Sequence, residues 1–388
     1  MPQTAARPRR GLYLHIPFCA RKCHYCDFVI TVKKSPEMRE RFFASLSREI
    51  EQASRIYGPL SFDTLYFGGG TPSLLSEEEI SRIAQRLFRE FRFNEGFEFT
   101  IEVNPGDADA SKIKRYRLLG ANRISVGAQT FNNALLKGSG RLHSAGDTIQ
   151  TVRLLREAGF DNLSLDFILN LPGQTLEDVS DSMNRAVALG AGQAVLYDLD
   201  VHEKTLFGSW RRRGMLTSAD EEGQWSMWKA ADNILSRAGY IPYELSSYAK
   251  PGYAAQHNLI YWKNEEYLGL GPGAFSYMDG VRYQYALDVE GYLSKCEAGD
   301  WTRDSEDFLS PEEIEIETFI TGLRLREGVD LSRFPLTGDR FRAGAEKLAG
   351  EGFLFLSDER VSFTQKGRSV ADRIFLELLP TREAGGIV

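Results

Sequence analysis

Short β-rich runs alternate with longer amphipathic segments through about the first 200 residues, and this alternation limits the possible folds. Runs with the composition of buried strands lie at residues 11–16, 64–70, 97–103, 122–129, 162–168 and 194–201. Helical spacing of apolar residues predicts helices near 36–56, from 76 onward, and near 107–119, 145–158 and 175–189. Ser76 and Glu79 have the spacing of a capping box, which predicts a helix start there. Repeated strand–helix alternation predicts a parallel sheet with helices outside it, as an open doubly wound sheet or a barrel.

Glycines and polar residues gather where these strands end. TLYFGGG leads into Thr71, and later strands end near Glu102, Gln129 and Asp166. In α/β folds the carboxyl edge of the sheet is where sites are built, and packing alone gives strands no reason to end in carboxylates and amides. These side chains are therefore candidate ligand contacts. Taken singly, Glu102 and Asp166 also fit ordinary helix caps or ion-pair partners.

Three of the four cysteines form a tight C-x3-C-x2-C motif at Cys19, Cys23 and Cys26. Four cysteines in 388 residues cannot form a disulfide framework, so a cysteine cluster in a reducing compartment indicates metal binding or catalysis. A Cys3His zinc site would need His15 or His24 as its fourth ligand. A redox C-x2-C pair would leave Cys19 unexplained.

A [4Fe–4S] cluster explains the three-cysteine motif better than zinc or a redox pair. Such clusters usually have four thiolates, so three thiolates leave one iron open to a ligand that can exchange. S-adenosylmethionine fits that position, because its amino and carboxylate groups can chelate the iron. One-electron transfer from the cluster can then cleave its sulfonium bond.

Further motifs follow in order: YLHIPFC, YCDF, GGGTPS, EVNPG, RISVGAQTF, GRLHS, LSLDFILNLPGQT, YELSSYAKPG and HNLIYW. They extend over nearly the whole chain and resemble the radical S-adenosylmethionine superfamily. Within it, they resemble the group of oxygen-independent coproporphyrinogen dehydrogenases and heme chaperones of the HemW type. The resemblance implies an α/β fold, an incomplete (β/α)6 barrel of the radical SAM type.

The resemblance also implies roles for residues at matching motif positions. Cys19, Cys23 and Cys26 resemble the cluster ligands. The implied S-adenosylmethionine contacts are Tyr13, Tyr25, Gly69, Gly70, Thr71, Glu102, Gln129, Arg141 and Asp166. These types suit the task, since carboxylates accept hydroxyl donors and arginine pairs with a carboxylate. Alternatively, Arg141 lies on a solvated turn and Gln129 only satisfies backbone groups.

Three features favour the chaperone type over the dehydrogenase type. Phe28 stands where the dehydrogenase has another cysteine, and only about ten residues precede Leu12, where the dehydrogenase has a longer N-terminal extension. The third feature is HNLIYW, a motif associated with heme binding in the HemW type. It implies heme contacts at His257, Asn258, Tyr261 and Trp262.

The chemistry of this motif suits heme, because an imidazole can ligate the iron and aromatic rings offer apolar faces. The alternative is structural: His257 and Asn258 cap a turn, while Tyr261 and Trp262 pack in the core.

Two positions depart from the family pattern. His202 stands where a glutamate is usual, and Phe275 stands where a histidine is frequent. These departures put in doubt any role that needs the usual polar group there. Of the other histidines, His15 is expected beside the cluster, His24 to be exposed and His143 to be structural.

Beyond about residue 310 the pattern changes to helix, helix, a two-stranded wing and helix, which predicts a small winged-helix-like α+β domain. The expected organisation is a disordered N-terminus over 1–10, the partial barrel over 11–240, an extension carrying HNLIYW over 241–305, and the winged-helix-like domain over 306–388. Cys296, in the extension, is expected as an isolated thiol on a surface helix.

Charge and hydropathy restrict the partners. The 47 Lys+Arg and 54 Asp+Glu give a net charge of −7, which does not favour nucleic acid or anionic membrane. No apolar stretch approaches the roughly 18 residues of a transmembrane helix. MPQTAARPRR lacks the apolar region of a signal peptide, so a cytoplasmic protein is expected.

We therefore expect a heme chaperone that binds heme and delivers it to apo-hemoproteins. Its other cofactors would be a [4Fe–4S] cluster with three cysteine ligands and an exchangeable S-adenosylmethionine. Membrane-bound respiratory proteins are candidate acceptors, and a homodimer is a candidate assembly. The alternative is a radical SAM enzyme, either one acting on porphyrins like oxygen-independent coproporphyrinogen III oxidase or a methyltransferase.

Overall fold

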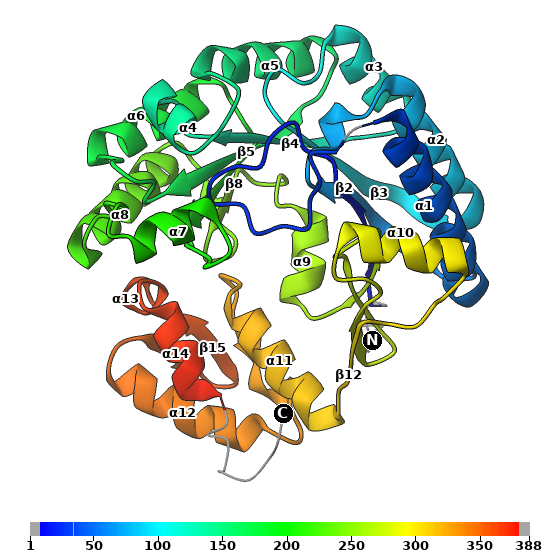
Figure 1. The fold of residues 1–388 in the computed structure, drawn as a ribbon. Helices are drawn as coiled ribbons and strands as arrows, with labels where there is room; N and C mark the ends of the chain where they lie inside the picture. The colour runs from blue at the N-terminus through cyan, green and yellow to red at the C-terminus, as the bar shows by residue number, and fades with distance from the viewer. Residues whose placement is uncertain (1–7, 34, 380–388) are drawn as a thin grey trace.

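A twelve-stranded sheet frames the computed structural model, which describes residues 8–33 and 35–379. Six parallel strands lie side by side in sequence order: β1 (Arg10–Ile16), β2 (Ser61–Gly69), β3 (Arg92–Val103), β4 (Arg123–Gln129), β5 (Asn162–Leu169) and β6 (Gln193–Asp198). Figure 1 shows them curving into an open arc with helices outside it. The incomplete (β/α)6 barrel is therefore confirmed. Most of the expected disordered start, residues 1–7, lies outside the described residues.

The outer helices follow the strands in turn. They are α1 (Pro36–Tyr57), α2 (Glu77–Glu90), α3 (Ala110–Leu118), α5 (Ala145–Glu157), α6 (Leu176–Ala188) and α8 (Glu221–Arg237), with the shorter η1 (Pro72–Leu74), α4 (Asn133–Gly138) and α7 (Leu206–Arg212). The predicted capping box is present: the Ser76 side chain accepts the Glu79 N–H, and the Glu79 carboxylate accepts the Ser76 N–H. Ser144 and Thr175 begin α5 and α6 in the same way. These helix starts are encoded locally.

The two faces of the strands differ in chemistry, because successive side chains point to opposite faces. On β1, Leu12, Leu14 and Ile16 are fully buried in the main hydrophobic core. On β3, Phe99 and Ile101 join the same core, whereas alternate positions are polar. The polar positions face the inside of the arc, so the barrel interior is where a polar site can form.

The segment after α8 adds strands to both edges of the six-stranded core. β8 (Ser247–Ala249) pairs antiparallel with β6, and β7 (Ile241–Pro242) pairs with β8. At the other edge β9 (Glu266–Leu270) pairs parallel with β1, and β10 (Phe275–Met278), β11 (Val281–Gln284) and β12 (Ser305–Phe308) follow antiparallel. Between the two edges, α9 (Gln256–Trp262) lies inside the arc (Figure 1).

The C-terminal part has its own hydrophobic core and a three-stranded antiparallel sheet. Its elements are α11 (Pro311–Leu323), β13 (Val329–Asp330), η2 (Leu331–Arg333), α12 (Gly338–Gly350), β14 (Leu354–Ser357), β15 (Arg360–Phe363), α13 (Gln365–Arg368) and α14 (Ala371–Leu378). The predicted order of helix, helix, hairpin and helix is present, and β13 adds the third strand. The small α+β domain is therefore confirmed. Arg324 Nη2 lies 3.3 Å from the buried Glu244 Oε2 and links this domain to the barrel segment.

Cys296 corrects one expectation, because the thiol is buried rather than exposed on a surface helix. It lies on α10 (Val289–Ala298), and Tyr292 and Leu293 on the same helix are also fully buried. Residues three and four apart share a helix face, so the thiol belongs to the face that packs into the core. No helix in residues 8–33 and 35–379 has the length and apolar character needed to cross a bilayer.

Candidate functional site

A cavity of about 430 Å³ lies at the carboxyl ends of the parallel strands. The predicted site residues that line it are Cys19, Cys23, Tyr25, Cys26, Gly69, Gly70, Thr71, Glu102, Gln129, Arg141 and Asp166. They come from the loop after β1 and from the ends of β2 to β5 and the segments that follow them. The fold thus brings together residues that the sequence places far apart.

The cysteine loop is tied to two distant segments through its main chain. The His24 N–H donates to the Ser139 carbonyl at 3.0 Å, and the Phe207 N–H donates to the His24 carbonyl at 2.9 Å. Within the loop, the Cys26 N–H donates to the Cys23 carbonyl at 3.2 Å. These bonds tie the cysteine loop to the segments around the cavity.

The thiols lie next to one hydroxyl and one guanidinium. Cys19 Sγ is 3.5 Å from Thr71 Oγ1, and Arg141 Nη1 donates to Cys23 Sγ at 3.7 Å. Burial raises the pKa of Cys19 to about 11 and also raises the pKa of Cys26. In the ligand-free cavity these two thiols are therefore protonated, and a metal that binds them must displace their protons.

The GGG run at the end of β2 is required by close packing. Gly69 has a φ of +101°, and a Cβ there would lie 2.4 Å from the His15 ring. A Cβ on Gly70 would lie 2.7 Å from the Ile16 carbonyl oxygen. Only glycine fits both positions, and the Gly70 N–H donates to the Ile16 carbonyl at 2.8 Å.

Two carboxylates from neighbouring strands line the cavity. Glu102 Oε1 accepts a hydrogen bond from the Tyr66 hydroxyl at 2.8 Å. Asp166 accepts from the Ser125 and Ser164 hydroxyls at 2.7 and 2.9 Å. Burial raises the pKa of Glu102 to about 7 and also raises the pKa of Asp166. In the described part of the chain neither carboxylate caps a helix or pairs with a cation within 4.0 Å, so both of the ordinary alternatives are wrong.

Gln129 and Arg141 form the third part of the lining. Gln129 has a φ of +63°, a strained conformation for a residue with a side chain. Arg141 Nη2 donates to Asn104 Oδ1 at 2.6 Å and to the Gly127 carbonyl at 3.0 Å. Arg141 Nε is buried with no hydrogen-bond partner among the described residues. Arg141 is therefore held inside the site and not on a solvated turn.

The donor set fits the group that the motif implies. Three thiols, two carboxylates without a paired cation and a guanidinium N–H without a partner match a cluster with a ligand bearing amino, carboxylate and hydroxyl groups.

The zinc alternative finds no support in the geometry. His15 Nε2 is 2.7 Å from the Val29 carbonyl oxygen, and His24 Nδ1 is 2.9 Å from the Gly138 carbonyl oxygen. No three His, Cys, Asp or Glu side chains in the described ranges are placed to hold a single metal ion. His24 is half-buried against Phe207 and Trp210, which corrects the expectation that it is exposed.

Comparison with known proteins agrees with this geometry. The radical SAM superfamily profile matches residues 13–186, and the HemN C-terminal domain profile matches residues 309–370. The heme chaperone HemW of Lactococcus lactis is 36% identical over 376 residues, which cover 95% of this chain and 96% of the relative. The chain belongs to the HemW family of radical SAM proteins.

Other members of the HemW family and one solved structure show the same relation. The heme chaperone HemW of Bacillus subtilis is 35% identical over 373 residues, covering 94% of this chain and 98% of the relative. The structure of coproporphyrinogen III oxidase (HemN) from Escherichia coli superposes with a TM-score of 0.85 at 22% identity, over 96% of this chain and 90% of that chain. That superposition shows a shared fold.

Five predicted site residues lie away from the cavity in this HemW-family chain. Tyr13 is inside the barrel, and its hydroxyl lies 3.1 Å from His15 Nδ1. The other four are on α9: His257, Asn258, Tyr261 and Trp262. Their proposed roles toward S-adenosylmethionine and heme stay predictions.

His257 is almost fully enclosed, with 1% of its surface exposed. Nδ1 lies 2.6 Å from Thr64 Oγ1 and Nε2 lies 2.7 Å from the Tyr261 hydroxyl. The imidazole also stacks on Tyr66, with ring centroids 4.9 Å apart. Trp262 at the end of α9 carries the Arg324 guanidinium on its face, 4.3 Å from the ring centroid.

The cavity also contains residues that sequence reasoning did not select. Asn104, Ser125 and Tyr197 line it, and Tyr66 reaches Glu102 from β2. The sequence could have indicated Asn104 as a site residue, because it is a polar residue that directly follows β3. Ser125, Tyr197 and Tyr66 lie within strands, where the alternation of faces could have found them once a neighbouring inward residue was known.

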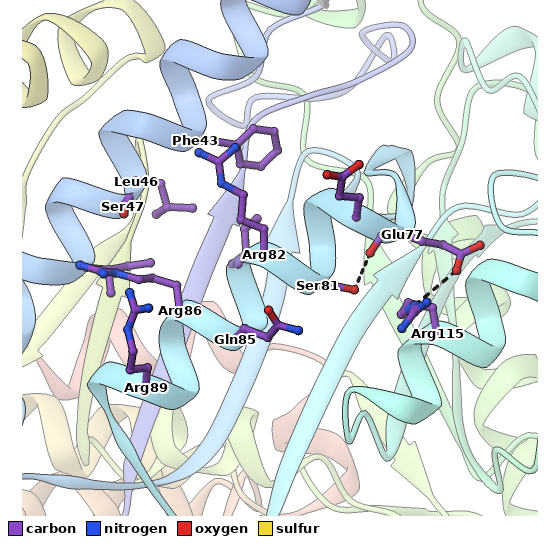
Figure 2. Close-up of a pocket in the computed structure, with 13 residues that line it drawn as sticks. Phe43, Leu46, Ser47, Glu77, Ser81, Arg82, Gln85, Arg86, Arg89 and Arg115 are labelled. Atoms are coloured by element: carbon purple, nitrogen blue, oxygen red, sulfur yellow. Dashed lines mark hydrogen bonds and ion pairs between the residues drawn. The ribbon is translucent and has the colours of Figure 1, made fainter.

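A larger hollow, about 740 Å³, lies on the outer surface between α1 and α2, and Figure 2 shows its lining. Its arginines are paired within the protein: Arg115 Nε lies 3.3 Å from Glu77 Oε2, and Arg82 Nη1 lies 3.2 Å from Glu40 Oε2. None of the predicted site residues lines it. Size alone therefore does not identify the site.

Proposed function

We propose that this chain is a heme chaperone that holds a [4Fe–4S] cluster and S-adenosylmethionine in the strand-end cavity, binds heme, and passes the heme to apo-hemoproteins in the cytoplasm. The proposal is supported by the names of the HemW relatives and by the resemblance of its motifs. The observation that carries it is the convergence of Cys19, Cys23 and Cys26 with the strand-end ligands in one cavity.

Each part of the cavity has a task in this proposal. The three thiolates hold three irons, which leaves one iron for S-adenosylmethionine; the bound cluster supplies one-electron transfer. Main-chain groups at Gly69 and Gly70 receive the methionine part. Arg141 offers its unpaired Nε–H to a carboxylate, and Glu102 and Asp166 accept ribose hydroxyl donors.

The cluster assignment is tested by metal analysis of protein reconstituted with iron and sulfide without oxygen. Wild type is expected to hold about four irons and four sulfides per chain. Cys19→Ala, Cys23→Ala and Cys26→Ala should each lose most of this content. Cys296→Ala is the matched control, because its thiol is buried outside the cavity, and it should keep the content.

The heme assignment is tested by titrating the reconstituted chain with hemin and following the absorbance of the bound heme. Transfer is then tested by mixing the heme-loaded chain with an apo-hemoprotein and measuring recovery of the acceptor's activity. Failure of wild type to bind hemin would overturn the chaperone proposal. Formation of 5′-deoxyadenosine coupled to turnover of coproporphyrinogen would instead favour the radical enzyme.

A further inference from the structure

A chain of polar contacts joins two of the cysteine thiols across the strand-end cavity. Cys19 Sγ lies 3.5 Å from Thr71 Oγ1, and Asn104 Nδ2 donates to Thr71 Oγ1 at 3.1 Å. On the other side, Arg141 Nη2 donates to Asn104 Oδ1 at 2.6 Å, and Arg141 Nη1 donates to Cys23 Sγ at 3.7 Å. Asn104 is at the centre of this chain, and among the described residues its amide is hydrogen-bonded to Thr71 and Arg141 and to neither thiol.

The direction of each bond in the chain follows from the groups that cannot reverse it. A guanidinium only donates, so the Asn104 amide must turn Oδ1 toward Arg141 and Nδ2 toward Thr71. Thr71 Oγ1 therefore accepts from Asn104 and keeps its own hydrogen for Cys19. Thr71 stands at the start of η1, yet its hydroxyl does not cap that helix. A cysteine that binds iron is a thiolate, which can only accept, so the Thr71 O–H donates to the Cys19 sulfur.

Asn104 is held in place by its main chain as well as by its amide. Its N–H donates to the Ser73 hydroxyl at 3.0 Å, and the fully buried Ser73 donates to Asp107 Oδ2 at 3.3 Å. The Asp107 N–H in turn donates to the Asn104 carbonyl at 3.2 Å. Asn104 therefore has a fixed position from which it orients both Thr71 and Arg141.

We infer that Asn104 is a positioning residue for the iron–sulfur cluster. It directs the Thr71 hydroxyl to Cys19 and the Arg141 guanidinium to Cys23, and through these two donors it raises the reduction potential of the cluster. This rests on the proposed function, which places the cluster on these thiols. Hydrogen bonds to the cluster sulfurs raise the potential, because reduction adds negative charge that a nearby donor stabilises. The positive charge of Arg141 beside Cys23 acts in the same direction.

The test is an anaerobic redox titration of the full chain, reconstituted with iron and sulfide, with dithionite as the reductant and electron paramagnetic resonance to follow the reduced cluster. Asn104→Leu keeps a side chain of similar size that neither donates nor accepts, so Thr71 and Arg141 lose their common support. Reduction should become about tenfold less favourable, which for one electron is a shift of about 59 mV toward negative potential. The midpoint potential is independent of the fraction of chains that carry a cluster, so partial loading does not affect the comparison.

Asn132→Leu is the matched control. Asn132 is also half-buried and bonded through both ends of its amide, since Oδ1 accepts from the Ala134 N–H at 2.8 Å and Nδ2 donates to Asp178 Oδ1 at 2.7 Å. It does not line the cavity, so its loss should lower stability and leave the potential at the wild-type value. An equal shift in both leucine variants would overturn the inference, because the shift would then come from a general loosening of the fold.

Thr71→Val tests whether Asn104 acts through the Thr71 hydroxyl. It removes the donor to Cys19 with little change of shape, so on its own it should also move the potential to more negative values. In the Thr71→Val background, Asn104→Leu should produce a smaller shift than in wild type, because only the arm through Arg141 remains. A full shift in that background would show that Asn104 does not act through Thr71.

Asn104→Asp is a second variant that decides the question if Asn104→Leu does not fold. The carboxylate keeps the size of the side chain and the bond to Arg141, but it cannot donate to Thr71. The potential should therefore shift in the same direction as in Asn104→Leu, and again by less in the Thr71→Val background.

The outcomes separate this inference from the proposed function. If wild type holds the cluster and the Asn104 variants keep its potential, the positioning role is overturned, while the cluster and the chaperone function stand. If reconstituted wild type holds no cluster, the proposed function fails first and the role of Asn104 fails with it.

Discussion

The barrel interior has two ends that are built from the same strands. At the end near α9, called the closed end below, polar side chains are enclosed by protein. At the other end, called the open end, polar side chains line the strand-end cavity. On β3, Glu98 lies at the end near α9 and accepts the main-chain N–H groups of Gln256 and His257 at 3.0 and 3.1 Å. Four residues further on the same strand, Glu102 lines the open cavity with a pKa raised to about 7.

The closed end uses its polar groups to hold structure. Arg123 is 2% exposed and donates from Nη2 to Gln193 Oε1 at 2.6 Å, and His257 is bonded through both ring nitrogens. Each end has one arginine Nε, that of Arg123 or that of Arg141, that is buried without a hydrogen-bond partner among the described residues. The difference lies in the surroundings, because Arg141 lines the open cavity whereas Arg123 is enclosed by protein.

The largest expected effect of this difference is on stability. Arg123→Ala should lower the free energy of unfolding by about 3–5 kcal/mol, because it leaves the buried Glu98 without its nearby cation. Arg141→Ala removes three hydrogen bonds at the open end, to Asn104, the Gly127 carbonyl and the Cys23 thiol, and should cost only about 1–2 kcal/mol. Urea denaturation of both ligand-free variants measures this. Equal losses would contradict the contrast between the ends.

His257→Ala should be the next largest change, at about 2–3 kcal/mol, since it leaves the Thr64 and Tyr261 hydroxyls buried without a partner. His202→Ala, at an exposed ring, should change unfolding by less than about 0.5 kcal/mol. Urea denaturation at neutral pH compares the two variants. A small effect of His257→Ala would show that the hydrogen bonds of His257 contribute little to the stability of the fold.

The burial of His257 leads to a prediction of how the free energy of unfolding varies with pH. Burial, with Arg123 nearby, lowers the pKa of His257 to about 3, whereas the unfolded chain has the ordinary value near 6.5. Below pH about 6.5 the unfolded state binds a proton that the folded state does not, so this stabilising contribution is lost as the pH falls toward 3. His257→Gln should make stability fall less steeply between pH 6.5 and 5 than in wild type. An unchanged slope would place the lost stability in other groups.

At the open end, the predicted effect is on ligand binding. Because the pKa of Glu102 is raised to about 7 and bound ribose hydroxyls prefer the ionised carboxylate, affinity for S-adenosylmethionine should rise with pH up to about 7. Below that value it should fall by up to about tenfold per pH unit. Anaerobic calorimetry of the reconstituted protein measures this.

A matched control exists for the Glu102 prediction. Glu49 is buried outside the cavity, accepts from the Tyr292 hydroxyl at 2.7 Å, and also has a pKa raised to about 7 by burial. Glu102→Gln should remove the pH dependence of binding, and Glu49→Gln should leave it in place. In both residues the raised pKa adds stability that is present below about pH 4.5 and is lost as the pH rises to about 7.

Local patterns explain how much of the fold was predictable. The predicted strand 11–16 corresponds to Arg10–Ile16, and Ser76 begins α2 as its capping box indicated. Glu102, Gln129 and Asp166, which were predicted as site residues because they lie at strand ends, line one cavity. Parallel strands place their carboxyl ends at one edge, so a pattern in the sequence became a site in space.

The rest depends on pairings between distant segments, which no local pattern encodes. α9 is inside the barrel because β8 pairs with β6 while β9 pairs with β1 at the other edge. The sequence HNLIYW has the residue types of a heme contact, but it does not reveal that Thr64 and Tyr261 engage both nitrogens of His257. For the same reason Cys296 could not be recognised as buried.

The smallest predicted effects come from Tyr261 and Tyr66, whose hydroxyls make hydrogen bonds at opposite ends of the barrel interior. Tyr261 bonds His257 at 2.7 Å, and Tyr66 bonds Glu102 at 2.8 Å, although both rings pack on His257. Tyr261→Phe should cost about 1 kcal/mol in unfolding and leave ligand binding unchanged. Tyr66→Phe removes a donor that lowers the pKa of Glu102, so the pH at which S-adenosylmethionine affinity levels off should move up. The free energy of unfolding and the affinity for S-adenosylmethionine are measured on both variants. If both variants change the same quantity, the two ends of the barrel interior are not independent.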